Sequence, residues 1–475
     1  MKLRITMTGL LALAAFSAPA LSDTLTVGPN FNDYDFITIT AAIANAAGGD
    51  EIVIQPGLYA ENLLITGKDL TLRNAGGGEV VIFGQNLNKC LRVTGAGTDV
   101  VLEGLTFSNG FSTSAGGGVA IEVNTTAQIT DCVIEDSITA NSGGGLYMSG
   151  GGTVTNTIIR GNSANATGGG IHIAGMLSKA FIDCVIEDNS ASDGGGFGYA
   201  AAGDIATISG CSFLGNTASR WGGAIALLGT GSAGIMETRD CVFSMNHADE
   251  AGGAVWVSDQ DVIQALNCVF EFNTAADLGG AVRNEQIFEA INCTFVNNDV
   301  LAPGVSDTFE SLRADANTNL LNTIVVNASA ASHTGAGQLN PFFSLVPEAP
   351  SGMTDANGNF SADPMFVDAA GGDYRLAAGS PAIDAGDSRG IFGGASFGYI
   401  SVLDVQTDIN GDVRNLDDPD TENTGVSVWE LCIDLGAFEF QPQAAAECTA
   451  DLNDDGMLNF FDISAFLSAF SAGCP

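Results

Sequence analysis

Short apolar runs recur between residues 105 and 298 of this chain, at a period of 25 to 30 residues. Each run holds three to five β-branched or aromatic residues and ends at Gly, Asn, Asp or Ser. The stretch lacks the 3.6-residue apolar spacing of a helical repeat, so the pattern predicts strands joined by turns. A repeat of this length forms about three short strands, which is one coil of a parallel β-helix.

Equivalent residues of stacked coils fall into columns that can be followed through the repeats. A cysteine column contains Cys132, Thr157, Cys184, Cys211, Cys241, Cys268 and Cys293. An apolar column two residues later contains Ile134, Ile159, Ile186, Phe213, Phe243, Phe270 and Phe295. Because a spacing of two places both columns on the same face of a strand, we expect them to form the core.

Asparagine and glycine mark two corners of each coil. The asparagine column contains Asn162, Asn189, Asn216, Asn246, Asn273 and Asn298. Stacked Asn side chains hydrogen-bond along the axis and tolerate the left-handed turn conformation, so this column predicts a ladder at a turn. The glycine pairs begin at Gly116, Gly143, Gly168, Gly194, Gly222, Gly252 and Gly279. They predict a second corner, where side chains would collide or a positive φ is required.

The ends of a β-helix need covers, because an exposed coil is an unpaired sheet edge. Residues 36–47 have the composition of a short amphipathic helix, which we expect to cover the N-terminal end. The first coil starts directly after this helix, and residues 61–110 add coils with weaker glycine marks.

Residues 1–22 have the features of a secretory signal, with Lys2 and Arg4 ahead of an apolar run from Leu10 to Phe16. That run is too short to span a bilayer, and no other part of the chain reaches 18 apolar residues. We therefore expect an exported protein, secreted or held at the cell surface, without a transmembrane segment.

The charge and the cysteines narrow the function classes further. The net charge is −40, from 55 acidic and 15 basic residues, which argues against binding of nucleic acid or anionic membranes and against unaided capture of polyuronates.

Cysteines stacked in a parallel ladder lie about 4.8 Å apart with parallel Cβ vectors, which fits disulfide geometry poorly. We expect the column to hold buried, un-ionised thiols that do not react. Cys448 and Cys474, which bracket a small C-terminal module, are expected to form a disulfide.

Three segments resemble known β-helix families. The opening D-E-I-V-I-Q-P-G-L-Y-A-E (50–61) resembles the start of pectin-lyase-like right-handed parallel β-helix proteins. The motif F-x-x-N followed by G-G-A-[IV], as at 243–246 and 252–255, resembles the repeat of chlamydial-type polymorphic outer-membrane proteins. Residues 363–387 and 433–440 resemble the C-terminal part of bacterial secreted β-helix proteins. The resemblance implies a right-handed β-helix, a fold that carries lyases, hydrolases, esterases and adhesins alike.

Residues 451–462, D-L-N-D-D-G-M-L-N-F-F-D, match a twelve-residue calcium loop. The predicted oxygen ligands come from Asp451, Asn453, Asp455, the Met457 carbonyl, Asn459 and Asp462. Gly456 supplies the sharp turn, and a helical pattern follows the loop. The segment resembles one half of a dockerin, in particular tails that end in Gly-Cys-Pro. The resemblance implies calcium as cofactor and a cohesin-like or other anchoring partner, although a full dockerin has two loops and this chain shows one.

In a β-helix enzyme, catalytic side chains are expected on the outward face of the strand after each glycine pair. The outward column is expected to be Ala120, Tyr147, His172, Gly198, Ala226, Trp256 and Arg283. It pairs no carboxylates on adjacent coils, and His172 and Arg283 are about 19 Å apart, too far for shared chemistry. Tyr147 beside His172, and Trp256 beside Arg283, predict a carbohydrate-binding stripe. The alternative is that outward residues on a sheet vary freely.

The sequence thus predicts an all-β, right-handed parallel β-helix with an N-terminal helical cap and a small α-helical calcium-loop module. The expected segments are a signal peptide (1–22), cap and first coil (23–60), β-helix repeats (61–300), C-terminal coils and cap (301–442), linker (443–447) and dockerin-like tail (448–475). The expected function is binding or adhesion to polysaccharide or a cell-surface glycan. A polysaccharide lyase or glycoside hydrolase, and a structural envelope protein, are the alternatives.

Overall fold

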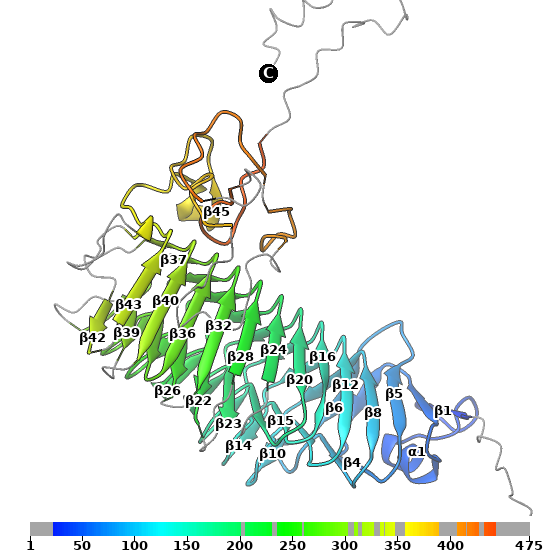
Figure 1. Ribbon diagram of the computed structural model, residues 1–475. Helices are drawn as coiled ribbons and strands as arrows, with labels where there is room; N and C mark the ends of the chain where they lie inside the picture. Colours follow the sequence, from blue (N-terminus) through cyan, green and yellow to red (C-terminus); the bar gives the residue numbers. More distant parts are fainter. Residues whose placement is uncertain are drawn as a thin grey trace, which may run out of the picture. The chain divides into compact units, whose positions relative to one another are not determined.

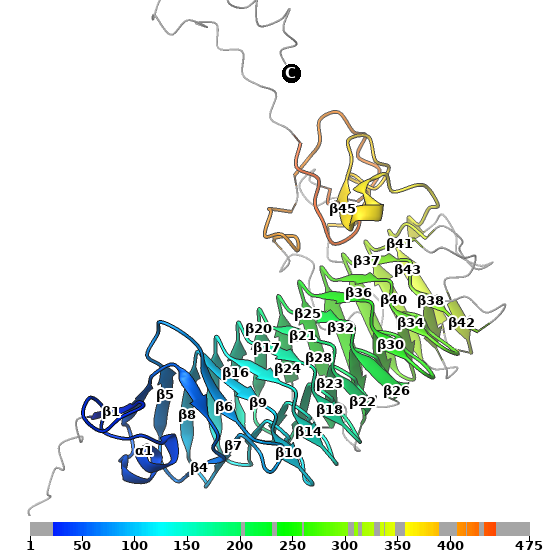
Figure 2. The same cartoon turned by 180° about the vertical axis from the view of Figure 1, so that it is seen from behind.

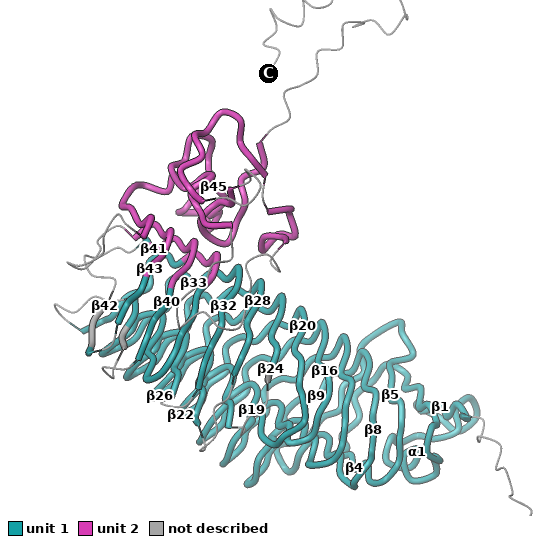
Figure 3. The backbone as a smooth tube through the Cα atoms, in the orientation of Figure 1, with its two compact units in different colours: residues 1–290, 295–319, 326–340 teal, residues 291–294, 320–325, 341–475 magenta. Residues whose placement is uncertain are grey.

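The structure is a computed structural model that describes residues 22–200, 205–229, 235–258, 261–302, 308–311, 316–326, 333–336, 338–346, 357–388, 406–414, 416–426 and 432–442 (Figure 1). It divides into two compact units (Figure 3). Unit 1 comprises Met1–Ala290, Phe295–Asn319 and Val326–Asn340, and unit 2 comprises Ile291–Thr294, Leu320–Val325 and Pro341–Pro475. In the described part, no helix is long and apolar enough to cross a membrane.

Unit 1 is built from four sheets, A to D, in which each strand pairs in parallel with its equivalent on the next coil. Sheet A has the order β1 (Thr24–Val27), β2 (Glu51–Ile54), β5 (Leu70–Asn74), β8 (Asp99–Glu103), β12 (Thr126–Thr130), β16 (Gly151–Thr155), β20 (Lys179–Ile182), β24 (Ile205–Ser209), β28 (Ile235–Arg239), β32 (Val262–Leu266), β36 (Ile287–Ile291), β40 (Asn317–Leu321) and β43 (Gln338–Phe342). Sheet B has the order β3 (Gly57–Tyr59), β6 (Val80–Phe83), β9 (Leu105–Ser108), β13 (Val133–Glu135), β17 (Ile158–Arg160), β21 (Val185–Glu187), β25 (Ser212–Leu214), β29 (Val242–Ser244), β33 (Val269–Glu271), β37 (Thr294–Val296) and β41 (Ile324–Val326).

Sheets C and D complete each coil. Sheet C has the order β4 (Leu63–Thr66), β7 (Leu91–Thr94), β11 (Val119–Ile121), β15 (Leu146–Met148), β19 (Ile171–Ala174), β23 (Phe197–Ala200), β27 (Ile225–Leu227), β31 (Val255–Val257), β35 (Val282–Asn284), β39 (Phe309–Ser311) and β42 (His333–Gly335). Sheet D has the order β10 (Phe111–Ser112), β14 (Ile138–Thr139), β18 (Ser163–Ala164), β22 (Ser190–Asp193), β26 (Thr217–Trp221), β30 (His247–Ala248), β34 (Thr274–Ala275) and β38 (Asp299–Val300). The predicted all-β parallel β-helix is confirmed.

The core includes the two columns that the sequence predicts. Ile186 pairs with Phe213, Phe213 with Phe243, and Phe243 with Phe270, and all four side chains are fully buried. The rings of Phe243 and Phe270 stack with centroids 4.5 Å apart and planes 6° from parallel. The repeat cysteines are buried free thiols, and burial raises the pKa of Cys132 to about 12. Dry packing against aliphatic and aromatic neighbours therefore keeps these thiols un-ionised.

The asparagine column forms the predicted ladder along one corner of the coils. The Asn216 carbonyl oxygen accepts hydrogen bonds from the backbone N–H and the side-chain amide of Asn189, at 3.1 and 3.0 Å. The Asn216 amide donates to the Asn246 side chain at 3.0 Å and to the Ile186 carbonyl at 2.8 Å. The left-handed conformation, however, belongs to the residue directly before each Asn, as at Gly215, where φ is +60°. The ladder residues themselves keep negative φ, because their side chains must point inward to meet one another.

The glycine corner is confirmed, and Gly194 and Gly195 show why it needs glycine. Gly194 has φ of +60°, the left-handed region that other residues avoid. A Cβ on Gly195 would lie 2.3 Å from the carbonyl oxygen of Thr217 on the next coil. The two positions thus need glycine for different reasons, backbone conformation at the first and close coil contact at the second.

The helix predicted over 36–47 is present as α1 (Ile39–Asn45), close to β1, β2 and β4 (Figure 1, Figure 2). The Thr38 hydroxyl caps it by accepting from the Ala41 N–H. The Glu61 carboxylate accepts from the N–H groups of Ile39 and Thr40 at 2.9 and 2.8 Å. These bonds satisfy N–H groups that the first turn of a helix leaves free. Its role as a cover for the end stays a prediction.

Unit 2 joins the two C-terminal segments that carry the family resemblance. Its described elements include β41 (Ile324–Val326), β44 (Phe366–Asp368), the 3₁₀ helix η2 (Ala369–Gly371) and β45 (Asp373–Leu376), with β44 and β45 antiparallel. The Asp434 carboxylate accepts the N–H groups of Asp384 at 2.8 Å and Phe440 at 2.5 Å. Arg414 and Glu439 form a fully buried ion pair at 3.3 Å. The acidic residues of these motifs therefore organise the backbone of unit 2.

Two large apolar residues occupy the left-handed position that precedes the ladder. Met245 and Phe272 have φ of +55° and +51°, and their side chains are 63% and 41% exposed. Gly161 and Gly215 hold the same position on other coils. Left-handed backbone costs roughly 1–2 kcal/mol for residues with a Cβ.

We predict that Met245→Gly and Phe272→Gly each raise the free energy of unfolding by roughly 0.5–1 kcal/mol, since relief of the left-handed strain exceeds the entropic cost of glycine. Denaturant unfolding of each variant measures the change. Met245→Ala and Phe272→Ala are the controls, because they remove the same exposed side chains while keeping a Cβ. An equal gain from alanine would show that the side chain, and not the backbone conformation, causes the cost.

Candidate functional site

The outer face of sheet C carries the column in which the sequence predicts a carbohydrate-binding stripe. The paired residues on successive coils are Leu64, Arg92, Ala120, Tyr147, His172, Gly198, Ala226, Trp256 and Arg283. The predicted column is therefore correct in register. The structure adds Arg92 and Leu64, which lie on coils with weaker glycine marks.

The predicted neighbours in this column stack as expected. The rings of Tyr147 and His172 lie 2° from parallel with centroids 5.8 Å apart. The guanidinium carbon of Arg283 lies 5.8 Å from the ring centroid of Trp256. The column thus supplies aromatic pairs at the spacing of successive coils.

The exposure that a sugar-binding stripe requires is not found at two of the four positions. Trp256 and His172 are buried, with 3% and 6% of their surface exposed. The physical reason is that residues directly ahead of glycine pairs pack against this column. Thr167, which precedes Gly168, is bonded through its hydroxyl to Nδ1 of His172 at 2.7 Å. Burial also lowers the pKa of His172 to about 4, so the ring is neutral at neutral pH.

A second tryptophan, Trp221, directly precedes the glycine pair at Gly222 and covers Trp256. Trp221 packs edge-on against Trp256, with centroids 4.5 Å apart and an interplanar angle of 82°. The Trp221 indole N–H donates to Glu250 at 2.9 Å, and the guanidinium carbon of Arg220 lies 3.9 Å from the Trp221 ring centroid. Arg220 also forms a two-pronged ion pair with Asp193 at 2.8 and 2.5 Å. Trp221, and not Trp256, is therefore the more accessible aromatic ring here.

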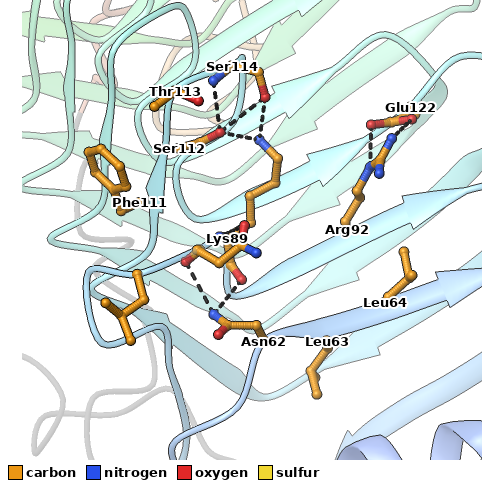
Figure 4. Close-up of a pocket in the computed structure, with 12 residues that line it drawn as sticks. Asn62, Leu63, Leu64, Lys89, Arg92, Phe111, Ser112, Thr113, Ser114 and Glu122 are labelled. Carbon is orange, nitrogen blue, oxygen red and sulfur yellow. Dashed lines mark hydrogen bonds and ion pairs between the residues drawn. The ribbon is translucent and has the colours of Figure 1, made fainter.

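A groove of about 530 Å³ lies at the N-terminal part of the same face (Figure 4). Its lining residues are Asn62, Leu63, Leu64, Leu87, Asn88, Lys89, Arg92, Phe111, Ser112, Thr113, Ser114 and Glu122. They come from β4, β7, β10, the end of β11 and the segment that leads into β7. The groove therefore combines two cations with amide, hydroxyl and apolar groups.

Lys89 is held in the groove by oxygen atoms of neutral groups. Its ammonium donates to the Ser112 hydroxyl and the Gly116 carbonyl at 2.7 Å, to the Ser114 hydroxyl at 3.3 Å and to the Ala115 carbonyl (Figure 4). Burial lowers the pKa of Lys89 to about 8. A large fraction of this amine is thus still charged at neutral pH.

Arg92 lines the opposite side of the groove and pairs with Glu122 on the next coil. Its guanidinium donates to both carboxylate oxygens, at 2.6 and 3.0 Å. The hydrogen bond from Arg92 lowers the pKa of Glu122, so this carboxylate is ionised. The pair fixes the Arg92 side chain while leaving it 48% exposed.

A row of buried polar side chains lies on the outer face of sheet A. Gln264 donates from its amide to the Glu289 carboxylate at 2.8 Å, and both residues are about as buried as the core. Farther along, the Asn340 amide donates to the Asn319 carbonyl oxygen at 3.0 Å. Burial raises the pKa of Glu289 against the opposing effect of the Gln264 hydrogen bond. Glu237, paired with Gln264 on the preceding coil, continues the row.

The strands that follow the glycine pairs belong to sheet C, so the outward column predicted from them does not include this row. Its signal is nevertheless present in the sequence, since Glu237, Gln264 and Glu289 each lie four residues before a member of the cysteine column. Counting four residues back from each cysteine gives a second outward column, which contains this row. The sequence does not predict that Glu289 is buried. A strand pattern indicates the face on which a side chain lies, but not what covers that face.

The predicted calcium ligands at 451–462 and the predicted Cys448–Cys474 disulfide lie outside the described residues. Within the part of the chain that the structure describes, no group of three or more His, Cys, Asp or Glu side chains is arranged to hold a metal ion. The tail thus stays a prediction from the sequence.

The family model for the right handed beta helix region matches residues 89–235. That match and the coil geometry agree on a right-handed parallel β-solenoid. No curated protein matches the sequence.

Solved structures similar to this one include pectate and alginate lyases. Pectate lyase Pel9A is 16% identical, with 88% of this chain and 97% of that chain covered and a TM-score of 0.47. The PL6 family alginate lyase AlyGC is 16% identical, with 73% and 54% covered and a TM-score of 0.43. A mannuronic acid specific family 6 lyase from human gut microbiota is 12% identical, with 72% and 92% covered and a TM-score of 0.37. At these identities the likeness concerns the fold.

The buried His172 predicts a specific pH dependence of stability. Its pKa is about 4 in the folded state against an ordinary value of 6.5, so the unfolded chain binds the proton first as the pH falls. The free energy of unfolding should therefore decline between about pH 6.5 and 4, by ~3 kcal/mol from this residue. Denaturant unfolding of wild type and His172→Gln across this range isolates the contribution.

Thr167→Val is the matched control, because it removes the hydrogen-bond partner of His172 without removing a titrating group. It should lower stability to a similar extent at every pH in the range. Identical pH slopes for wild type and His172→Gln would contradict the prediction.

Proposed function

We propose that this chain is an exported polysaccharide-binding β-solenoid and that the groove on sheet C is its binding site. The observation that carries the proposal is the composition of the groove. Arg92 provides a charged donor, Lys89 contributes positive charge, and the hydroxyl groups of Ser112, Thr113 and Ser114 lie beside them. Sugar rings present hydroxyl groups, and in uronates also carboxylates, which are the acceptors that such donors bind.

Apolar side chains complete the groove. Leu64 and Leu87 are 53% and 72% exposed, so aliphatic surface is available to the C–H faces of a sugar ring. An apolar lining with a few placed polar groups is typical of ligand sites. The column continues from Arg92 through Ala120 to the partly exposed Tyr147, which offers a further ring surface for a longer chain.

The groove also differs in charge from the rest of the chain. It holds two cations and the single carboxylate of Glu122, whereas the chain as a whole carries −40. An acidic polymer approaching the protein is repelled at long range, and this repulsion is screened by salt and by divalent cations. We therefore expect binding of acidic polymers to strengthen with calcium.

The remaining parts of the proposal come from the sequence. Residues 1–22 direct export, and the loop at 451–462 binds calcium and attaches the solenoid to a cohesin-like or other anchoring partner. A binding face and an attachment tail on one chain would hold a polysaccharide at a surface.

Arg92→Ala should weaken retention of acidic polysaccharide about tenfold, because it removes the charged donor that would pair with carboxylates in the groove. The measurement is affinity electrophoresis of the full-length mature protein in gels that contain neutral or acidic polysaccharides, with calcium or with EDTA. Leu64→Asp should weaken retention as well, since it places a carboxylate on the apolar part of the groove.

Arg160→Ala is the matched control. Arg160 forms the same kind of cross-coil pair with Glu135, at 2.8 Å and with 49% of its side chain exposed, but on sheet B. If Arg92→Ala and Arg160→Ala migrate alike in every gel, the groove is not the binding site.

A second function, cleavage of the glycosidic bond, is favoured by one observation, the buried row on sheet A. Glu289 has a raised pKa, as a general acid requires, and Glu237 lies two coils away, roughly 10 Å along the axis. Inverting glycosidases place two carboxylates about 6.5–9.5 Å apart. The 2% exposure of Glu289 places this function second, because substrate must reach the carboxyl group.

If the row is catalytic, Glu289→Gln and Glu237→Gln should each abolish the fall in polymer mass that wild type causes, because each removes one of the two proton-transfer groups. Size-exclusion chromatography of treated polysaccharide measures this. The wild-type rate should fall as the pH rises through the raised pKa of Glu289, since the acid must hold its proton. Glu135→Gln on sheet B is the control, and an unchanged polymer mass with wild type would exclude cleavage.

A further inference from the structure

The outer face of sheet D presents two parallel columns of small polar side chains. One contains Ser163, Ser190 and Thr217, which pair on successive coils. The other, two residues later along the chain, contains Asn165, Ser192 and Ser219, which line the same cavity although the register shifts after Ala191. Because a spacing of two keeps side chains on one face, all six point away from the core, while the alanines between them are buried.

These columns form a trough of about 450 Å³ that runs across four coils. His247 and Asp249 close the C-terminal end, joined by a contact of 3.2 Å between Nε2 and the carboxylate. Successive coils are roughly 4.8 Å apart, so the trough offers polar rows at a regular axial interval of roughly 14 Å in total. The length and regularity suit an extended polymer and not a compact small molecule.

Most of the trough's hydroxyl groups are available to a ligand. Ser190 donates to Ser163 at 3.2 Å. Among the described residues, by contrast, the side chains of Ser192, Thr217 and Ser219 make no hydrogen bond, although backbone groups around them are paired. Unused donors and acceptors in a concave site can exchange bonds with water for bonds with a ligand.

The charge of the trough separates it from the groove on sheet C. Its lining contains no Lys or Arg and one carboxylate, Asp249. In a chain of net charge −40, such a surface repels acidic polymers and offers them no counter-charge. It is compatible with a neutral ligand that carries many hydroxyl groups.

Phe272, which is exposed and strained, lies on the coil that follows His247, just beyond the lining of the trough. It directly precedes the ladder residue Asn273 and strand β34, whose Thr274 is hydrogen-bonded to Nδ1 of His247 at 2.9 Å. Its φ of +51° and its 41% exposed side chain are unfavourable for stability, and the ring does not pack in the core. Strained, exposed aromatic residues are more often found where a ligand is bound.

We propose that the sheet D trough binds a single chain of a neutral polysaccharide, laid along the solenoid axis, with Phe272 as an aromatic platform at its C-terminal end. The site is distinct from the sheet C groove in position, in charge and in the class of polymer it takes. The polymer's hydroxyl groups meet the two polar columns, and one sugar face meets the ring of Phe272.

Affinity electrophoresis of the full-length mature protein in soluble neutral glucan, xylan, mannan and galactan tests the proposal, with polygalacturonate as the acidic comparison. Ser192→Arg fills the middle of the trough and should weaken retention in at least one neutral gel tenfold or more. Thr153→Arg, the same kind of change on the outer face of sheet A, should leave retention unchanged. Phe272→Gly should weaken retention while raising thermal stability, a combination that a purely structural role does not give.

Arg92→Ala separates this proposal from the sheet C groove. If Arg92→Ala keeps retention in neutral gels and Ser192→Arg loses it, the result supports the trough. This holds whether or not the groove binds acidic polymers. Retention lost with Arg92→Ala and kept with Ser192→Arg assigns the neutral polymer to the groove and overturns the trough. Absence of retention of wild type in all four neutral gels also overturns it.

Discussion

The asparagine ladder is the interaction on which the rest of unit 1 depends. Each amide connects coils on both sides, as Asn216 does by accepting from Asn189 and donating to Asn246. The ladder is fully buried, so a coil displaced by one residue would leave amide groups without partners in a dry interior. Apolar packing of Phe243 on Phe270 stabilises the stack, but rings tolerate sliding better than amides do. The ladder therefore fixes register, and register fixes every outer column.

Fixed register explains which parts of the structure can be predicted from the sequence. The inner columns repeat one chemistry coil after coil, so the core, the ladder and the glycine corner follow from periodicity alone. The order of the outer column on sheet C follows as well, since Tyr147 must pair with His172 once the ladder is in place. Exposure does not follow, because it depends on individual side chains such as Thr167 and Trp221, which directly precede glycine pairs and pack against this column. That is why a correctly placed Trp256 is buried.

Several arginines of this acidic chain join neighbouring coils. Arg92 with Glu122, Arg160 with Glu135 and Arg220 with Asp193 each bridge two coils on an outer face. The Arg92 and Arg160 pairs are partly exposed and contribute at most ~1 kcal/mol each, so their effect on stability is small. They do hold guanidinium groups in fixed positions on the surface. Lys89 differs, because its ammonium is held by hydroxyl and carbonyl oxygens and so keeps its net charge available in the groove.

A solenoid offers a polymer the same kind of contact on every coil, and this decides how such a surface can bind. Each hydroxyl contact with a sugar replaces one with water and gains on the order of 1 kcal/mol or less. Once one sugar unit is seated, the next is held near the following coil at high effective concentration, so small contributions add up along the axis. Affinity then depends on how many consecutive coils keep a compatible side chain. The three hydroxyl-bearing coils of the trough, ended by His247, set a short binding length, and within it one bulky residue interrupts contacts on both sides.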